Sequence, residues 1–333
     1  MKLDGQAAID YLAREVTGAD AAESSHWRMY HSTFRFLEDR FEGLQGFGGS
    51  QTRPGAFRWA LHRFLQRRFR RIGRGFPGFA AIDARANEIT RAQGRAYDLD
   101  VLRQALTLAF LGKHVAHPTQ TVCVIGDGFA SMTALLLATN AASRVILVNL
   151  TKTLLVDLWY LRLWMGSARF ESAVCLVTDR DGLSAALTGS AGATGCVVAI
   201  AAGHHELLRG CPFDLVLNIV SMQEMDPPVI AAYFADLRAV AESRKVLFYC
   251  CNREEKMLPD GTVTRFDAYP WDVADRVHVD ELCPWHQQHY AFRPPFYRPY
   301  DGPIRHRLVT LAPASRRISS NAAGAINESY ISE

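Results

Sequence analysis

The chain has 333 residues, of which 49% are hydrophobic and 21% charged, and this suits one large α/β domain with an extension or two modest domains. Its net charge of +3 is too small to indicate a nucleic-acid-binding protein. The seven cysteines lie mostly in apolar runs and form no Cys-x-x-Cys pair, so we expect no zinc site and a reducing compartment.

Hydropathy predicts a cytoplasmic protein. The first residues, MKLDGQAAIDYLAREV, include acidic side chains and lack an apolar stretch long enough for a signal peptide. No run of about 18 apolar residues occurs. We therefore expect no transmembrane segment, and we leave the oligomeric state open.

Residues 1–95 predict a helical cap region. Ile9, Leu12 and Val16 recur at helical spacing within residues 1–20. Residues 63–74 (RFLQRRFRRIGR) are strongly basic with interleaved aromatics. Such a segment is typical of a solvated helix face, or of a patch for an anionic substrate carrier or a membrane surface.

Residues 96–314 predict a doubly wound α/β domain of the Rossmann-like type. A helix is expected over residues 97–114, capped by Asp98 or Asp100. Continuous apolar runs then alternate with helical stretches, which indicates parallel strands buried on both faces. The expected strands are residues 121–125, 144–148, 173–177, 196–201, 213–219, 245–250 and the closing 306–312. The Ser/Asn/Ala-rich residues 315–333 predict a disordered tail.

A glycine turn joins the first strand of this domain to a helix. The sequence there is VCVIGDGFA, so Gly126, Asp127 and Gly128 follow the strand directly and Ala130 supplies a small third residue. Glycines at this point let the backbone approach a ligand at the carboxyl end of a sheet. We expect a cofactor site here.

Two cofactor classes compete for such a turn. A dinucleotide site prefers Gly-x-Gly-x-x-Gly with a pyrophosphate on the helix N-terminus, but the sixth position is Ser131 and Asp127 would repel a phosphate. S-adenosylmethionine carries a sulfonium and an ammonium, which an acidic residue suits better. Asn149 and Leu150 end the second strand, where Asn149 could hydrogen-bond ribose hydroxyls.

Four segments resemble the sugar O-methyltransferases, a branch of the class I S-adenosylmethionine-dependent methyltransferases associated with polysaccharide biosynthesis. They are VIGDGFAS, VILVNLTKTLLVDLWYL, FDLVLNIVSMQEMDPPVIAAYF, and VLFYCCN followed by Tyr269-Pro270 and HRLVTL. They extend over about residues 95–312. The resemblance implies a class I methyltransferase sheet, S-adenosylmethionine as cofactor, and a sugar or glycan acceptor that is free, nucleotide-linked or lipid-linked.

The acceptor is expected beyond the strand at 213–219, where a polar joint follows. Glu224 could accept the proton of an acceptor hydroxyl, while Asn218 and Gln223 could hydrogen-bond either ligand. The same residues also fit a capping box, with Ser221 three positions before Glu224.

Other candidate residues lie on the same rim. In class I methyltransferases a loop before this strand touches the adenine, which suggests His204, although His204 and His205 also fit a surface loop. Asn252 ends the next strand, and His306, which opens the last one, could act as a base near neutral pH. An ordinary structural histidine is the alternative for His306.

The aromatic segment within residues 253–305 is expected to bind the acceptor. Tyr269 and Trp271 could stack on sugar faces; a Pro-rich wrap on the core is the alternative. The histidine spacings match no standard site, so we expect no metal. Other possible functions are an NAD- or nucleotide-binding oxidoreductase and a non-catalytic protein of the same fold.

Overall fold

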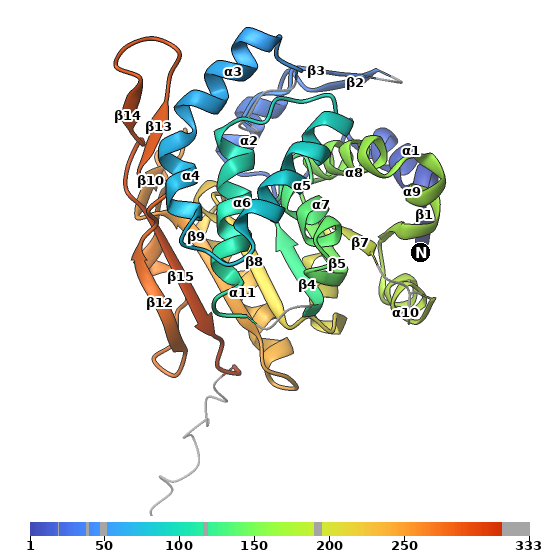
Figure 1. Cartoon of the computed structure of the whole chain (residues 1–333). Coiled ribbons are helices and arrows are strands. Elements are labelled where there is room, and N and C mark those ends of the chain that lie inside the picture. The colour runs from blue at the N-terminus through green and yellow to red at the C-terminus, as the bar shows by residue number, and fades with distance from the viewer. Residues whose placement is uncertain (19, 38–39, 47–51, 116–118, 190–194, 315–333) are drawn as a thin grey trace, which may run out of the picture.

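The computed structural model describes residues 1–18, 20–37, 40–46, 52–115, 119–189 and 195–314, so the predicted tail lies outside the described residues. Its core is a sheet in the order β1-β6-β7-β5-β4-β8-β9-β15-β12 (Figure 1). In that order the strands are β1 (Lys2–Asp4), β6 (Val174–Val177), β7 (Cys196–Ala201), β5 (Ala142–Asn149), β4 (Thr119–Ile125), β8 (Leu215–Ile219), β9 (Leu247–Arg253), β15 (Ile304–Thr310) and β12 (Arg276–Leu282).

The sheet is mostly parallel. All pairs from β6 through β9 are parallel, whereas β1, β15 and β12 join antiparallel at the edges. The parallel strands are nearly continuous runs of buried residues. The predicted α/β class and doubly wound winding are confirmed, because apolar runs of this kind need helices over both faces.

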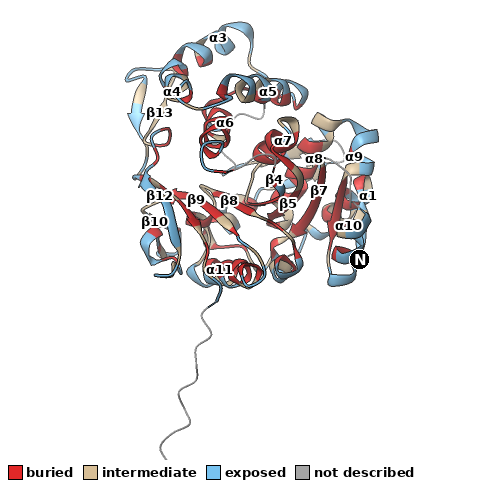
Figure 2. Cartoon of the chain, turned by 60° about the horizontal axis from the view of Figure 1, so that its bottom comes forward, coloured by how far each residue is buried: buried red, intermediate tan, exposed pale blue. Residues whose placement is uncertain are grey.

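Helices cover both faces of the sheet (Figure 2). One face packs against α1 (Gly5–Glu15), α5 (Phe79–Ala92), α6 (Leu99–Leu111), α7 (Ser131–Ala138), α8 (Thr151–Met165) and α9 (Ser167–Ala173). The other packs against α10 (Arg180–Gly189), η1 (Ala202–Gly210) and α11 (Pro227–Ala241). Successive residues of β4 alternate between the two cores, with Val122 in the first and Cys123 in the second. Asp98 caps α6 by accepting the backbone N–H groups of Asp100 and Val101.

The N-terminus differs from the predicted single helix. Residues 2–4 form β1, which pairs antiparallel with β6 at the sheet edge, and α1 begins at Gly5 with φ +48°. Ile9 and Leu12 are buried as the periodicity predicts, but the helix ends before Val16. The edge strand β6 has backbone groups that residues 2–4 can pair with, and these hydrogen bonds would not form if the three residues were helical. Residues 2–4 therefore extend the sheet and α1 packs on one of its faces, while the cap region and its boundary at residue 95 stay a prediction.

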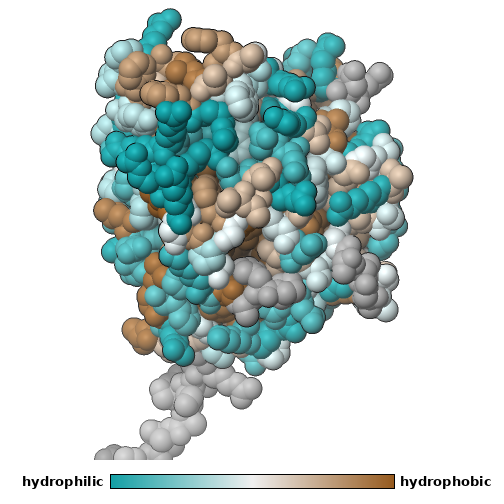
Figure 3. Space-filling view, in the orientation of Figure 1, coloured by the Kyte–Doolittle hydropathy of each residue, from teal (hydrophilic) through white to brown (hydrophobic). Residues whose placement is uncertain are grey.

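The rest of the extension lies over the carboxyl edge of the sheet. It contains α2 (Ser25–His31), β2 (Arg35–Leu37), β3 (Arg40–Glu42), α3 (Ala56–Leu65) and α4 (Arg67–Gly73). The basic segment falls on the end of α3 and on α4; Figure 3 shows hydrophilic side chains gathered over α4, whereas hydrophobic side chains are exposed over α3. Arg63, Arg67, Arg68 and Arg71 are exposed, which fits the solvated helix face.

Residues 253–305 form a peripheral layer of short strands around the β15 edge. They include β10 (Glu255–Met257), β11 (Val263–Arg265), η3 (Phe266–Ala268), β13 (Gln288–Tyr290) and β14 (Tyr297–Pro299). Across the described ranges, no helix is long and apolar enough to cross a bilayer.

A buried ion pair fastens this layer to α11. The Arg238 guanidinium donates to both carboxylate oxygens of Asp275, at 2.7 and 2.8 Å, and to the carbonyls of Pro270 and Ala312. Burial alone would raise the pKa of Asp275, but hydrogen bonds from Arg238 and from the backbone of Asp272 and Ala312 lower it below its ordinary value. The carboxylate therefore stabilises the fold at neutral pH, and this contribution is lost as the pH falls through the lowered pKa.

We expect Asp275→Asn to lower the free energy of unfolding by about 3 kcal/mol at pH 7, because it leaves the buried Arg238 charge without its anionic partner. Urea unfolding measures this loss, which should shrink toward acidic pH. Glu255→Gln breaks the exposed pair with Arg265 and should cost less than about 0.5 kcal/mol. Equal losses in the two variants would contradict the assignment.

Candidate functional site

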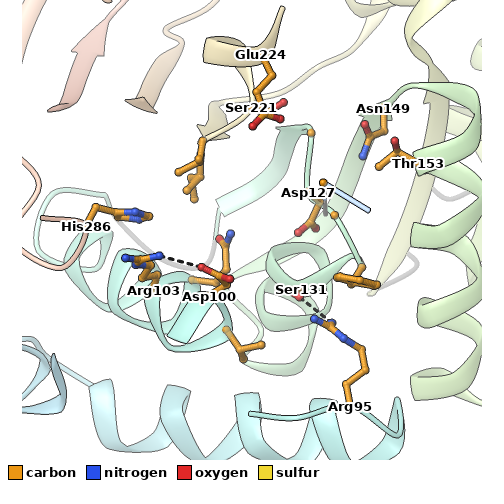
Figure 4. Close-up of a pocket in the computed structure, with 18 of the residues that line it drawn as sticks. Arg95, Asp100, Arg103, Asp127, Ser131, Asn149, Thr153, Ser221, Glu224 and His286 are labelled. Atoms are coloured by element: carbon orange, nitrogen blue, oxygen red, sulfur yellow. Dashed lines mark hydrogen bonds and ion pairs between the residues drawn. The ribbon is translucent and has the colours of Figure 1, made fainter. Parts of the chain in front are cut away.

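A cavity of about 360 Å³ opens where the sheet changes winding direction. Strand β4 pairs with β5 on one side and with β8 on the other, so the connections after β4 and β8 diverge at their carboxyl ends. Ligands of doubly wound sheets bind in this crevice. The cavity is lined by residues that follow β4, β5 and β8, by α2 and α6, and by residues 286–300 (Figure 4).

The glycine turn forms the floor of the cavity. Gly126 and Gly128 have φ values of +72° and +66°, and Phe129 and Ala130 continue in the left-handed region. Such backbone is unfavourable for residues other than glycine and persists where the surroundings fix it. At position 126 a side chain is also excluded by space, because a Cβ there would overlap Oγ and Cβ of Ser221.

Asp127 caps the helix after the turn. Its two carboxylate oxygens accept the backbone N–H groups of Met132 and Thr133, both at the start of α7, at 2.8 and 2.7 Å. Burial raises the pKa of Asp127, and these hydrogen bonds and the charge of Arg95 oppose the rise. Asp127 still lines the cavity, but its oxygens are engaged with α7.

A second buried acid, Asp157 on α8, ties the turn to the end of β5. One of its oxygens accepts the Ala130 N–H at 2.8 Å and the other accepts the Asn149 amide at 2.8 Å. The amide oxygen of Asn149 in turn accepts the Leu150 N–H. Burial, and then the neighbouring charge of Asp127, raise the pKa of Asp157 well above its ordinary value. Asp157 therefore joins the glycine turn to the end of β5 without lining the cavity itself.

Arg95 is the buried cation beside this acidic pair. Its guanidinium donates to Ser131 and Gln93 and lies 3.8 Å from the centre of the Phe129 ring. It lines the cavity next to the start of α7, and Figure 4 shows it on the side of the turn opposite Glu224. Burial lowers the pKa of Arg95, but an arginine stays charged.

Glu224 is an ionised carboxylate on the opposite wall. It lies 3.0 Å from Nζ of Lys256 and 3.4 Å from Nε2 of His26. Burial alone would raise the pKa of Glu224, but the hydrogen bond with His26 and the charge of Lys256 lower it. A carboxylate of this kind is a weak proton acceptor and a good binding group. The predicted capping box does not form, because Ser221 makes no side-chain cap and lies against Gly126.

A smaller, mainly apolar hollow of about 20 Å³ adjoins the cavity. The two share Trp27 of α2, Asn149 and Glu224. Leu150 and Ala202 contribute its apolar wall. Together the two spaces contain a polar part over the glycine turn and a smaller apolar part lined by Trp27, Leu150 and Ala202.

Five of the predicted cofactor residues line these two spaces: Gly126, Asp127, Gly128, Asn149 and Leu150. Glu224, the predicted proton acceptor, lines both. Ala130 lies beneath them with its N–H held by Asp157. The remaining predicted residues lie elsewhere among the described part of the chain, and they line neither space.

Asn218, Asn252 and Gln223 form a buried network that shapes the wall of the cavity. The Asn218 amide donates to Ile125 and accepts from Met222 N–H and from Asn252. Asn252 accepts the Gln223 N–H, and the Gln223 side chain accepts the Arg253 N–H. All three are at most 1% exposed, so the structure gives them the role of holding the loop that presents Ser221 and Glu224.

The predicted base and stacking residues are also away from the cavity. His306 is buried within β15, between the Tyr249 hydroxyl and Glu281. His204 borders a separate surface hollow near Lys152. Tyr269 and Trp271 pack into the core under α11. An apolar pattern at a strand cannot by itself distinguish a rim residue from a core residue, which explains these differences.

The sequence did not single out several cavity residues. Arg95, Asp100, Arg103 and His286 all line it, and Figure 4 shows Arg103 and His286 side by side at one end. They come from the linker before α6, from α6 itself and from the peripheral layer. The one available signal was the aromatic and histidine-rich run at 283–300, whose His286, His289 and Tyr300 do reach the cavity.

Comparison with known proteins finds no matching family profile and no matching curated protein. Among solved structures, a protein of Nostoc punctiforme assigned as an O-methyltransferase is 13% identical with a TM-score of 0.36, over 92% of this chain and 95% of that one. An S-adenosylmethionine-dependent methyltransferase of Leishmania major is 13% identical with a TM-score of 0.34, over 65% and 74%.

Replacing Gly126 with alanine should destabilise the fold by more than about 2 kcal/mol, because a left-handed alanine costs roughly 1–2 kcal/mol and its Cβ overlaps Ser221. In a Ser221→Gly background the overlap is gone, and the cost should fall to about 1–2 kcal/mol, which is the backbone part alone. Urea unfolding of the four proteins measures both values. The same cost in both backgrounds would contradict the close approach.

Both oxygens of Asp157 accept hydrogen bonds, one from the Ala130 N–H and one from the Asn149 amide. In Asp157→Asn one of these oxygens becomes an NH₂ group that faces another donor, so we expect the protein to be destabilised by about 2 kcal/mol or more. Asn149→Asp alone places two carboxylates together. The double exchange restores donor–acceptor pairing, so we expect a favourable coupling of about 1–3 kcal/mol. Chemical unfolding of the double-mutant cycle measures it, and additive losses would rule out the proposed pairing.

Proposed function

We propose that this chain is an S-adenosylmethionine-dependent methyltransferase that uses the cavity at β4, β5 and β8. The observation that carries the proposal is the occupied N-terminus of α7. Asp127 takes the N–H groups of Met132 and Thr133, and Asp157 takes that of Ala130. These are the donors that a pyrophosphate would need, so a dinucleotide would have to displace two buried carboxylates.

A cofactor that has no phosphate and carries cationic groups suits this floor. Asp127 and Glu224 line the cavity as acidic groups, which favour the ammonium and the sulfonium of S-adenosylmethionine. Arg95, beside Ser131, is the matching cation for its carboxylate. In this arrangement the ammonium and the carboxylate of the cofactor would face opposite charges at different points along the turn.

The adenosine part would occupy the side of the 360 Å³ cavity that borders the adjoining hollow, because the hollow itself, at about 20 Å³, is too small for a purine. Leu150, Ala202 and Trp27 line the hollow, and this apolar and aromatic border suits a flat aromatic base. Asn149 lies between the two spaces, where its amide oxygen keeps a free lone-pair direction toward a ribose hydroxyl after accepting the Leu150 N–H. The cofactor supplies an electrophilic methyl group, and the chain's own residues bind and orient it.

The acceptor would enter from the opposite end of the cavity. There α6 and the peripheral layer contribute Asp100, Gln104, His289 and Tyr300, a polar lining with an aromatic ring that suits a polyhydroxyl compound. Together with the resemblance of the sequence, this lining supports O-methylation of a sugar or glycan intermediate. Glu224 would bind a hydroxyl or a cationic group, since its lowered pKa disfavours proton abstraction.

Calorimetric titration with S-adenosylhomocysteine tests the proposal. We expect micromolar binding, and we expect Trp27→Ala to weaken it by about 10-fold, the effect of roughly 1.4 kcal/mol of lost aromatic packing. Trp59→Ala removes a partly exposed tryptophan of α3 and should leave the affinity unchanged. Binding of NADH in place of S-adenosylhomocysteine, or equal effects of the two substitutions, would contradict the proposal.

A further inference from the structure

Three metal-binding side chains converge at the end of the cavity where His286 lies. Cys251 comes from β9, and Cys283 and His286 come from the turn after β12. Their two Sγ atoms and one imidazole nitrogen all lie within 4.8 Å of one another, and all three side chains are buried. Of the three, His286 also lines the cavity.

The backbone brings the three together before any ligand binds. The His286 N–H donates to the Cys283 carbonyl at 3.0 Å and closes the Cys-Pro-Trp-His turn. The Cys283 sulfur is hydrogen-bonded to the backbone of Trp285. Cys251 is held inside the sheet, paired with Ile219 of β8 and His306 of β15.

Outer contacts fix this turn in place. Arg103 of α6 donates to the carbonyls of Trp285 and Gln288, at 3.2 and 2.8 Å. The Gln287 amide donates to the carbonyls of Cys283 and Ile304, at 3.0 and 2.7 Å. Contacts of this kind orient metal ligands and contribute to metal affinity.

The imidazole of His286 needs a partner that the protein does not supply. Within the described ranges, neither ring nitrogen of His286 has a hydrogen-bond partner, although the side chain is 2% exposed. A buried polar group without a partner is unfavourable. A metal ion between His286 and the two thiols would use one of these nitrogens and leave the other to the cavity.

We propose that Cys251, Cys283 and His286 bind one Zn²⁺, whose fourth position opens toward the cavity. Two thiolates and a neutral imidazole balance the ion's charge, as a buried site requires. Zn²⁺ prefers sulfur and nitrogen ligands in tetrahedral geometry, and three protein ligands with one open position are typical of catalytic rather than structural zinc.

The role of this site rests on the proposed function. A hydroxyl or thiol of the acceptor that reaches the fourth position loses its proton to water more readily, because the metal lowers its pKa. The resulting anion takes the methyl carbon from the sulfonium, so that one S–C bond breaks, one O–C or S–C bond forms, and a neutral thioether remains. Neither Glu224 nor His306 is then needed as the base.

The sequence expectation of no metal missed this arrangement. It tested Cys-x-x-Cys pairs and histidine spacings, whereas here a Cys-x-x-His turn is completed by a cysteine from another strand. Cys250, the neighbour of Cys251, points into the opposite core. Only the strand's orientation shows which of the two thiols faces His286.

Metal analysis of the full-length protein, purified without chelator after expression with added zinc, tests the proposal. We expect about one Zn²⁺ per chain. Replacement by Co²⁺ should give the intense visible bands and the thiolate charge-transfer band of a tetrahedral site. Cys251→Ser, Cys283→Ser and His286→Asn should each weaken Zn²⁺ binding by more than the roughly 10–100-fold cost of losing an outer contact.

Cys250→Ser is the matched control, since it changes an equally buried thiol of the same strand and should retain the metal. Zinc content near zero with no thiolate band in the cobalt spectrum would overturn the proposal. So would a Cys251–Cys283 disulfide in peptide mapping, or ligand variants that hold as much zinc as the unaltered protein. S-adenosylhomocysteine titration of the same preparation tests the methyltransferase assignment separately, because either result can fail while the other holds.

Discussion

The site depends on one buried carboxylate, that of Asp157. It binds the Ala130 N–H at the end of the glycine turn and the Asn149 amide at the end of β5, so it fixes two adjacent strand ends and α8 relative to one another. A carboxylate without water must have its oxygens occupied by donors. Because both are, the turn is held in its left-handed conformation through Phe129 and Ala130.

This constraint also underlies the proposed choice of ligand. Because Asp127 accepts the backbone N–H groups of Met132 and Thr133, the N-terminus of α7 is already capped by an acidic side chain of the protein. Helix N-termini attract anions because of their free N–H groups, and here the protein has already supplied one. What remains at the floor is Asp127 with Arg95 beside it, and the proposed choice of S-adenosylmethionine over a phosphate-bearing cofactor rests on this arrangement.

The walls of the cavity come from segments of the chain that are separate in sequence from the glycine turn at its floor. Trp27 lies on α2, Arg103 on α6, and His286 in a turn of the peripheral layer. The Asn218–Gln223–Asn252 network positions the loop at Ser221 and Glu224 without touching the cavity. These amides looked like ligand-binding groups in the sequence, because polar residues at strand ends either bind ligands or satisfy the backbone of a sharp turn, and the sequence does not distinguish the two.

The sequence by itself determined the α/β class, the parallel strands, the glycine turn and Asn149 at the adjoining strand end, because continuous apolar runs and glycine placement reflect local burial and local backbone geometry. It also identified Glu224, since a polar joint after a strand faces the same edge of the sheet. Only the tertiary structure showed that Asp157 joins the glycine turn to the end of β5, that His306 and Tyr269 are core residues, and that Cys251 meets Cys283 and His286. These depend on which elements become neighbours and which way each side chain points, and pairing between distant segments leaves no periodic pattern in a single sequence.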